Sequence, residues 1–309
     1  MNVTAKLLGF LVALLAVFGG AVGIGRVVGP VAPTTASSHG DMDMGKSEEG
    51  PSTTMPKGLL VSQDGYTFRL TQTQASPGTE VPVDFTIQGP DGRPVTHFDE
   101  EHEKRLHLIA IRRDFSGFQH VHPEMASNGT WSTTLDLTAG QWRLFADFKA
   151  TGSDAVTLGT DLAVPGDYEP AAPSADSRTA TVDGYTVTLD GNLAAGREVK
   201  LTLRVTRNGQ PVTDLEPYLG AYGHLVALRA GDLAYLHVHP EGTPDDGSTK
   251  PGPGIVFYTE VPSSDRYQLY LNFKHEGQVR TAAFTVTASA GTSSGGSGPT
   301  GGGHSGDAH

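Results

Sequence analysis

The chain repeats itself, and this duplication limits its fold more than any other feature of the sequence. Residues 94–124 align without a gap onto residues 211–241, and twelve of the 31 aligned positions are identical. The shared residues include a single histidine (His107 and His224) and the run His-Val-His-Pro-Glu. Outside this stretch, Asp-Gly-Tyr-Thr occurs once in each copy. Two copies of one domain therefore account for most of the 309 residues.

Each copy consists of short segments in which apolar and polar residues alternate between Gly, Pro, Asn and Asp, a pattern typical of β-strands. The expected strands are 66–72, 81–88, 105–112, 118–122, 130–137, 141–148 and 157–164 in the first copy, and 185–190, 199–206, 224–229, 234–239, 255–261, 266–273 and 280–287 in the second. No interior segment has a helical period. The pattern predicts an all-β fold of two tandem immunoglobulin-like or cupredoxin-like β-sandwiches, which we call repeat 1 (61–167) and repeat 2 (181–288).

The N-terminal segment indicates the compartment. Residues 7–25 are uncharged and lie between Lys6 and Arg26, a length that just covers a hydrocarbon core. Residues 1–29 are therefore expected to be a transmembrane signal anchor or, alternatively, a cleaved signal peptide. Lys6 favours a cytoplasmic start. The repeats then lie outside the cytoplasmic membrane, in a single-pass protein or, after cleavage, a secreted one.

The remaining segments are rich in Pro, Ser, Thr and Gly. They predict a disordered tether (30–60), a disordered linker (168–180) and a disordered tail (289–309).

Composition excludes several function classes. The chain has 34 acidic and 22 basic residues, a net charge of −12 and no basic stripe, which argues against nucleic-acid binding because phosphate affinity needs clustered Lys and Arg. The absence of Cys excludes disulfides, iron–sulfur clusters, thiol nucleophiles and Cys-type zinc sites. The chain has 12 His, so a bound metal would need His, Met, carboxylate or carbonyl ligands.

One hairpin in each copy brings histidines together. In repeat 2, a turn at Gly231-Asp232 places His224 opposite His239, with His237 on the same face as a diagonal neighbour. The same loop length in repeat 1 places His107 opposite His122, beside His120. Apolar residues share the face in both copies, so each cluster is expected at the end of an apolar face, at the rim of its sandwich. These residues are Ile109, Ile111, Phe118, Val226, Leu228 and Tyr235.

Three adjacent imidazoles predict a metal site. If protonated they repel, and if neutral they leave buried nitrogens unpaired, whereas a bound metal resolves both problems. The predicted ligands form two sites, His107, His120 and His122 in repeat 1, and His224, His237 and His239 in repeat 2. Further candidates are His102 and Met125, His39, Met42 and Met44 in the tether, and Asp147, Asn272 and His275 near comparable strand ends. Thioethers beside histidine favour copper over zinc.

The residues HVHP, HLI, HLV and HGDMDMG, on a predicted sandwich outside the membrane, resemble those of extracytoplasmic copper-binding proteins of bacteria. These are the CopC-type copper-resistance sandwiches and the small membrane-anchored YtkA-like domains. The resemblance implies a β-sandwich fold for the two repeats and copper as the bound ion.

The leading hypothesis is a non-enzymatic metal-binding protein for sequestration, tolerance or delivery, with a metal-trafficking protein as its partner. Two alternatives stay open. Three His ligands with an open position also form catalytic metal centres, and a tandem sandwich without metal could bind a partner protein or a cell-wall polymer.

Overall fold

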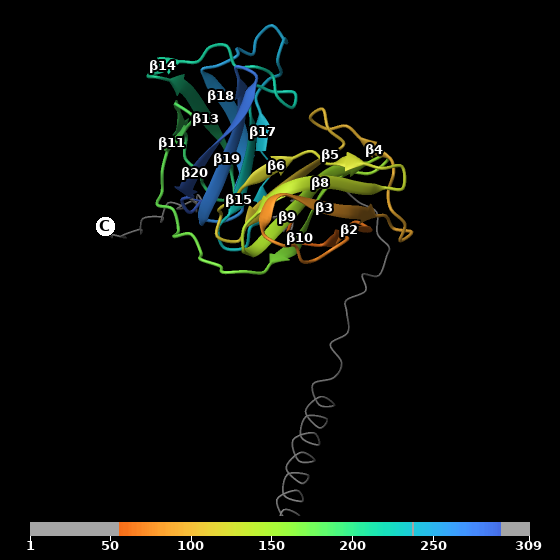
Figure 1. Cartoon of the computed structure of the whole chain (residues 1–309). Coiled ribbons are helices and arrows are strands. Elements are labelled where there is room, and N and C mark those ends of the chain that lie inside the picture. Colours follow the sequence, from red (N-terminus) through yellow and green to blue (C-terminus); the bar gives the residue numbers. More distant parts are fainter. Residues whose placement is uncertain (1–55, 237, 292–309) are drawn as a thin grey trace, which may run out of the picture. The chain divides into compact units, whose positions relative to one another are not determined.

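A computed structural model of the chain describes residues 56–236 and 238–291. All of them belong to one compact unit, residues 54–309. Every regular element in these residues is a strand (Figure 1), which confirms the predicted all-β class. No helix long and apolar enough to cross a membrane occurs within the described ranges. The expected anchor or signal peptide at 1–29 and nearly all of the tail lie outside them.

Repeat 1 is a sandwich of two antiparallel sheets. The first, in the order β1-β2-β3-β8-β7, contains β1 (Ser62–Gln63), β2 (Tyr66–Leu70), β3 (Gly78–Gln88), β8 (Thr130–Leu137) and β7 (Glu124–Met125). The second, in the order β10-β9-β5-β6, contains β10 (Ala155–Val164), β9 (Gly140–Ala150), β5 (Leu106–Arg112) and β6 (Gln119–Val121), with β4 (Phe98–Asp99) paired to β9. Side chains such as Phe85, Trp131 and Phe148 fill the core between them.

Repeat 2 has the same plan. Its first sheet, in the order β11-β12-β13-β18-β17, contains β11 (Thr179–Val182), β12 (Tyr185–Asp190), β13 (Glu198–Arg207), β18 (Gly254–Glu260) and β17 (Val238–Pro240), with β14 (Gln210–Pro211) paired to β13. Its second, in the order β16-β15-β19-β20, contains β16 (Tyr235–Leu236), β15 (His224–Arg229), β19 (Arg266–His275) and β20 (Gln278–Thr287). Every expected strand is present within a few residues, except that the segment expected at 234–239 is divided between β16 and β17.

The strand order is that of an immunoglobulin-like sandwich. With the strands lettered in chain order, β2, β3, β8 and β7 form an ABED sheet, and β5, β9 and β10 form the facing CFG sheet with β6 added beside C. In repeat 2, β12, β13, β18 and β17 form the corresponding ABED sheet. The facing CFG sheet consists of β15, β19 and β20, with β16 added beside β15. The two repeats are therefore tandem immunoglobulin-like sandwiches.

Both faces of β5 and of β15 are buried. Because side chains alternate along a strand, one face of each strand enters the core of its own sandwich and the other points away from it. The core-facing residues are Leu106, Leu108 and Ala110 of β5, and Leu225 and Ala227 of β15. The residues on the opposite faces are His107, Ile109 and Ile111 of β5, and His224, Val226 and Leu228 of β15. A third apolar layer must cover these outward faces.

The two outward faces cover each other. They form one apolar cluster drawn from both repeats: Ile109, Ile111 and Phe145 with Val226, Leu228, Leu233, Tyr235 and Tyr270, flanked by Phe115 and Phe118. The rings of Phe118 and Tyr270 are stacked with centroids 4.0 Å apart. Each buried side chain of this size contributes about 1.5–3 kcal/mol. The apolar face expected at the rim of each sandwich is thus the packing surface between the repeats. Periodicity could not separate a core face from an outer face, because both read as alternating apolar residues.

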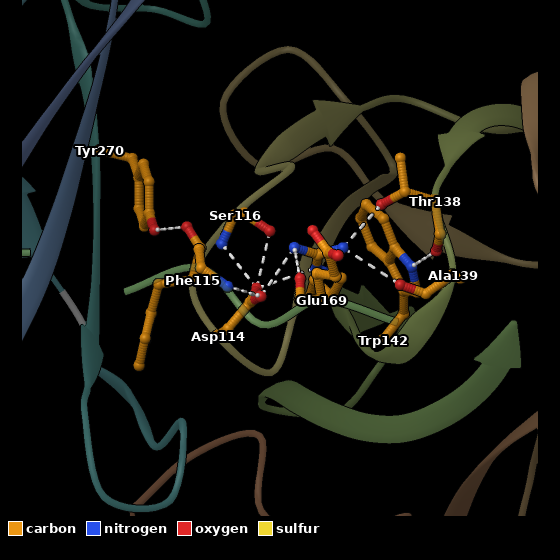
Figure 2. Close-up of polar contacts among 10 residues, drawn as sticks. Asp114, Phe115, Ser116, Thr138, Ala139, Trp142, Glu169 and Tyr270 are labelled. Atoms are coloured by element: carbon orange, nitrogen blue, oxygen red, sulfur yellow. Dashed lines mark hydrogen bonds and ion pairs between the residues drawn. The ribbon is translucent and has the colours of Figure 1, made fainter. Parts of the chain in front are cut away.

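Polar contacts hold the loop between β5 and β6 in place (Figure 2). Asp114 accepts hydrogen bonds from the backbone N–H and hydroxyl of Ser116, at 3.1 and 2.7 Å, and pairs with Arg112 at 2.7 Å. The Tyr270 hydroxyl of repeat 2 donates to the backbone carbonyl of Phe115 at 3.0 Å. Asp114 also accepts from the N–H of Ala171 at 2.8 Å. The linker, expected to be disordered, is therefore anchored to repeat 1.

The end of the tether is also packed against the repeats. The Arg143 guanidinium donates to the carbonyls of Gly58 and Leu59 at 2.7 and 2.9 Å, and Lys57 forms a β-bridge with Tyr235. A side chain at Gly159 would lie only 2.0 Å from the Gly58 carbonyl oxygen, so glycine is needed where this segment crosses β10. The folded region thus begins by residue 57, before the boundary at 61 expected from composition.

Candidate metal centre

Three histidines of repeat 1 converge on the outward face of the sheet. His107 lies on β5 and His120 on β6, and the register Ile109↔His120 places His122, just after β6, opposite His107. One ring nitrogen from each residue can be chosen so that all three lie within 4.8 Å of one another. The predicted convergence of these three side chains is confirmed.

Hydrogen bonds define the protonation of two of these rings. His107 Nε2 lies 3.0 Å from the backbone carbonyl of Glu101, which can only accept, so Nε2 carries the proton. His120 Nδ1 lies 3.0 Å from Asn272 Oδ1, and Asn272 Nδ2 donates to Thr281 Oγ1 at 2.7 Å. With the amide in this orientation, His120 Nδ1 is the donor. Each ring is held by an N–H group that points away from the other ring.

The two remaining nitrogens therefore face each other without a proton between them. His107 Nδ1 and His120 Nε2 are 3.1 Å apart, and each presents a lone pair when its ring is neutral. Two lone pairs at this separation repel unless a cation lies between or beside them. The cation is either a proton, which makes one ring an imidazolium, or a metal ion.

Burial disfavours the proton. It lowers the pKa of His120 to about 3, and the neighbouring His107 ring lowers it further in the same direction. Burial and His107 likewise lower the pKa of His122 to about 4, and burial lowers the pKa of His107. At neutral pH the three rings are uncharged and retain their lone pairs, the state in which imidazole binds a metal. The residues present therefore fit a metal ion.

His122 borders a cavity. Its Nε2 is buried with no hydrogen-bond partner within the described part of the chain, and the ring forms part of the wall of a cavity of about 440 Å³. Met125 lines the same cavity and is half-buried against the core of repeat 1. The structure thus brings Met125 to the side of the cluster where His122 lies. Three carboxylate side chains also line this cavity: Glu100, Glu103 and Glu124.

Two more imidazoles lie against the cluster. His224, on β15 of repeat 2, stacks on His107 with ring centroids 5.6 Å apart and planes 7° apart, and its centroid is 5.0 Å from that of His120. His102 is exposed, 5.5 Å from His224 and 6.1 Å from His107. Burial and the surrounding histidines lower the pKa of His224 well below its usual value.

The arrangement predicted for repeat 2 is not formed as expected. The register of β15 and β16 is the predicted one, Ala227↔Leu236, but the chain then enters the other sheet, where His239 is exposed and pairs with Tyr258 of β18. His239 therefore does not lie opposite His224 in a ladder. His224 instead lies beside the histidines of repeat 1. His237, like His39, Met42 and Met44, lies outside the described residues.

The weaker candidates have different outcomes. His275 is buried in repeat 2, where Nδ1 bonds the Tyr185 hydroxyl at 2.7 Å and Nε2 bonds Asp214 at 3.1 Å, so it belongs to a separate polar network. Asp147 pairs with His107 across β9 and β5 and accepts a hydrogen bond from Thr157 at 2.7 Å. Asn272, the corresponding residue of β19, contacts His120. Its position near a strand end was the only signal of this in the sequence.

Comparisons with known proteins identify a family. The model of a family described as "Domain of unknown function (DUF8832)" matches residues 61–164 and 180–290. No curated protein matches this chain.

Three solved structures illustrate the general likeness. A DUF4426 family protein from Pseudomonas aeruginosa is 7% identical with a TM-score of 0.27, over 37% of this chain and 97% of that one. The adhesin FdeC of Escherichia coli is 15% identical with a TM-score of 0.23, over 74% and 65% of the two chains. The adhesin InvE of Yersinia pseudotuberculosis is 11% identical with a TM-score of 0.22, over 74% and 60%. At these values the likenesses carry no functional information.

Proposed function

This chain belongs to the DUF8832 family, a domain of unknown function. We propose that it is a copper-binding protein. The ion is bound by His107, His120 and His122, and the protein acts outside the cytoplasmic membrane in sequestration, tolerance or delivery. Binding rather than catalysis is its role. Residues 1–29 hold it at the membrane or direct its secretion, and a metal-trafficking protein exchanges copper with it.

The observation that carries the proposal is the 3.1 Å approach of His107 Nδ1 and His120 Nε2. Each ring donates its other N–H to a fixed acceptor, Glu101 or Asn272. In metal sites, the N–H of a ligating histidine is held in this way by a carbonyl or carboxylate, which orients the ring and exposes the lone pair. The lowered pKa values of the cluster keep protons from replacing the metal at neutral pH.

The choice of copper rests on the donor types. Imidazole suits copper, zinc and nickel, and thioether sulfur favours Cu(I). Met125 lines the cavity beside His122, and the tether carries Met42 and Met44 near His39. A sulfur donor beside imidazoles supports copper in preference to zinc, and it is consistent with the resemblance to the extracytoplasmic copper-binding proteins.

The test is a metal titration of the purified full chain with Cu(I), Cu(II) and Zn(II), followed by metal analysis. We expect His120→Gln/His122→Gln to abolish tight binding at the cluster. The matched control is His97→Gln, an exposed histidine of the same repeat whose Nδ1 contacts Thr96. A chain with His39, Met42 and Met44 all replaced by Ser removes binding by the tether. Copper binding that is unchanged in His120→Gln/His122→Gln would show that the proposal is wrong.

A further inference from the structure

We infer that the metal centre is shared between the two repeats, with His224 of repeat 2 as the fourth imidazole ligand and Asn272 as a positioning residue for His120. The inference rests on the proposed function and extends it. It replaces two independent sites by one centre that forms only where the repeats meet.

The duplicated fold explains how His224 reaches the centre. His107 and His224 occupy equivalent positions on β5 and β15, both on the outward face. The two outward faces pack on each other through the apolar cluster of Ile109, Val226 and their neighbours. Equivalent residues at the end of each face therefore meet, and the two imidazoles lie stacked with centroids 5.6 Å apart.

The chemistry of His224 favours a ligand role. The ring of His224 is surrounded by other imidazoles, those of His102, His107 and His120, with centroids 5.0 to 5.6 Å away. A fourth nitrogen beside three imidazoles gives the four-coordinate set typical of closed metal sites. The His224 ring lies beside those of His107 and His120 rather than within the group of three nitrogens, and we infer that its side chain rotates to bind the ion.

Asn272 acts from repeat 2 on the geometry of His120. Its Oδ1 lies 3.0 Å from His120 Nδ1, and its own amide nitrogen is committed to Thr281 Oγ1 at 2.7 Å. The amide is therefore held with its oxygen toward the ring, which fixes the lone pair on His120 Nε2 toward His107. Repeat 1 has Asp147 at the corresponding position, where the carboxylate accepts from Thr157. Only when the repeats are docked does His120 receive its acceptor.

The decisive experiment measures copper affinity, stoichiometry and the number of imidazole ligands in the full chain, the last from the nitrogen couplings of bound Cu(II) in pulsed electron paramagnetic resonance. We expect one tightly bound ion and four imidazoles. His224→Gln should weaken binding tenfold or more and reduce the number to three. The matched control is His239→Gln, an exposed histidine of the same repeat, which should change neither.

Asn272 is tested by rescue. Asn272→Leu should weaken Cu(II) binding severalfold and alter the couplings, whereas Asn272→Asp, which keeps an acceptor toward His120, should restore both. Near-ultraviolet circular dichroism, to which the stacked Phe118 and Tyr270 contribute, checks that the repeats remain docked in every variant. If His224→Gln loses that signal, His224→Asn is measured in its place. Its side chain is polar and smaller, and the same loss of copper affinity is expected.

The outcomes separate the inference from the proposed function. Unchanged affinity and couplings in docked His224→Gln, or loss of a second bound ion in His239→Gln, would overturn the shared centre while the function stands. If His107→Gln also leaves binding unchanged, the proposed function itself is wrong.

Discussion

Repeats 1 and 2 carry the same His-Val-His-Pro-Glu run, yet they use it differently. In repeat 1 the chain stays beside β5 through Val121, so that His120 and His122 face His107, and it joins the other sheet only at β7. In repeat 2 the pairing with β15 ends at Leu236, and the chain joins the other sheet at Val238. The point at which a strand changes sheets therefore decides whether a histidine faces the cluster or solvent.

The longer loop of repeat 2 accompanies this difference. In repeat 1 only residues 126–129 connect β7 to β8, whereas residues 241–253 connect β17 to β18. The longer loop includes an Asp246 carboxylate that accepts hydrogen bonds from the backbone N–H groups of Ser248 and Thr249 at 2.7 and 2.6 Å. In repeat 1 the run therefore completes a cluster with His107, whereas in repeat 2 the ligand candidate is His224, upstream of the run.

The largest effect is expected from a substitution that separates the two repeats. Val226 is fully buried in the apolar cluster between them, so Val226→Asp places an unpaired carboxylate there, at a cost of several kcal/mol. We expect a large loss of stability in urea unfolding and loss of tight copper binding. The control Val279→Asp alters a valine that is 43% exposed and should change both by little. Equal effects of the two substitutions would contradict a buried interface.

Acid should weaken the folded protein through the cluster of repeat 1. The pKa is about 3 for His120 and about 4 for His122, against about 6.5 in the unfolded chain. Between these values the unfolded chain binds protons that the folded chain does not, so this stability is complete above pH 6.5 and is lost as the pH falls. For His120 alone the slope is about 1.4 kcal/mol per pH unit.

The measurement is urea unfolding of the metal-free chain between pH 7 and pH 4.5. His120→Gln should flatten the pH dependence, and His97→Gln should leave it unchanged. The same slope in wild type and His120→Gln would show that His120 does not remain neutral in the folded protein.

A smaller effect is expected at the loop between β5 and β6. Tyr270→Phe removes the hydrogen bond to the Phe115 carbonyl but keeps the ring that stacks on Phe118. We expect a loss of about 0.5–1.5 kcal/mol in the free energy of unfolding, with copper stoichiometry preserved. A loss of copper binding comparable to that of Val226→Asp would mean that this hydrogen bond, rather than the apolar cluster, holds the repeats in register.

The smallest effect distinguishes sulfur from nitrogen ligands. Met125→Leu keeps the volume that packs against repeat 1 and costs less than about 1.5 kcal/mol of stability. If the Met125 sulfur is a ligand, the Cu(I) affinity of Met125→Leu should be severalfold lower than that of the wild type, while the Zn(II) affinity is unchanged. Equal Cu(I) affinities in the two proteins would limit the ligands to imidazoles.

Much of the fold could be predicted because alternation and turn residues are local signals. The strands β2, β12 and β15 end at or near the residues expected, and the hairpin register that brings His107 opposite His122 follows from loop length alone. The three-histidine cluster of repeat 1 was predictable for the same reason. Residues two apart in one strand share a face, and a hairpin brings strands that are neighbours in sequence together.

The rest depended on contacts between distant parts of the chain. Sequence alone did not indicate that Ile109 and Val226 would pack on each other, since an outer face that is buried by a second domain has the same alternation as a core face. Nor did it indicate that His120 would meet Asn272, 152 residues away. The histidines, the absence of cysteine and the duplication determined what kind of ligand set this protein offers. The tertiary structure decided where that set is assembled, because packing the two equivalent apolar faces against each other is what brings His224 and Asn272 to the cluster of repeat 1.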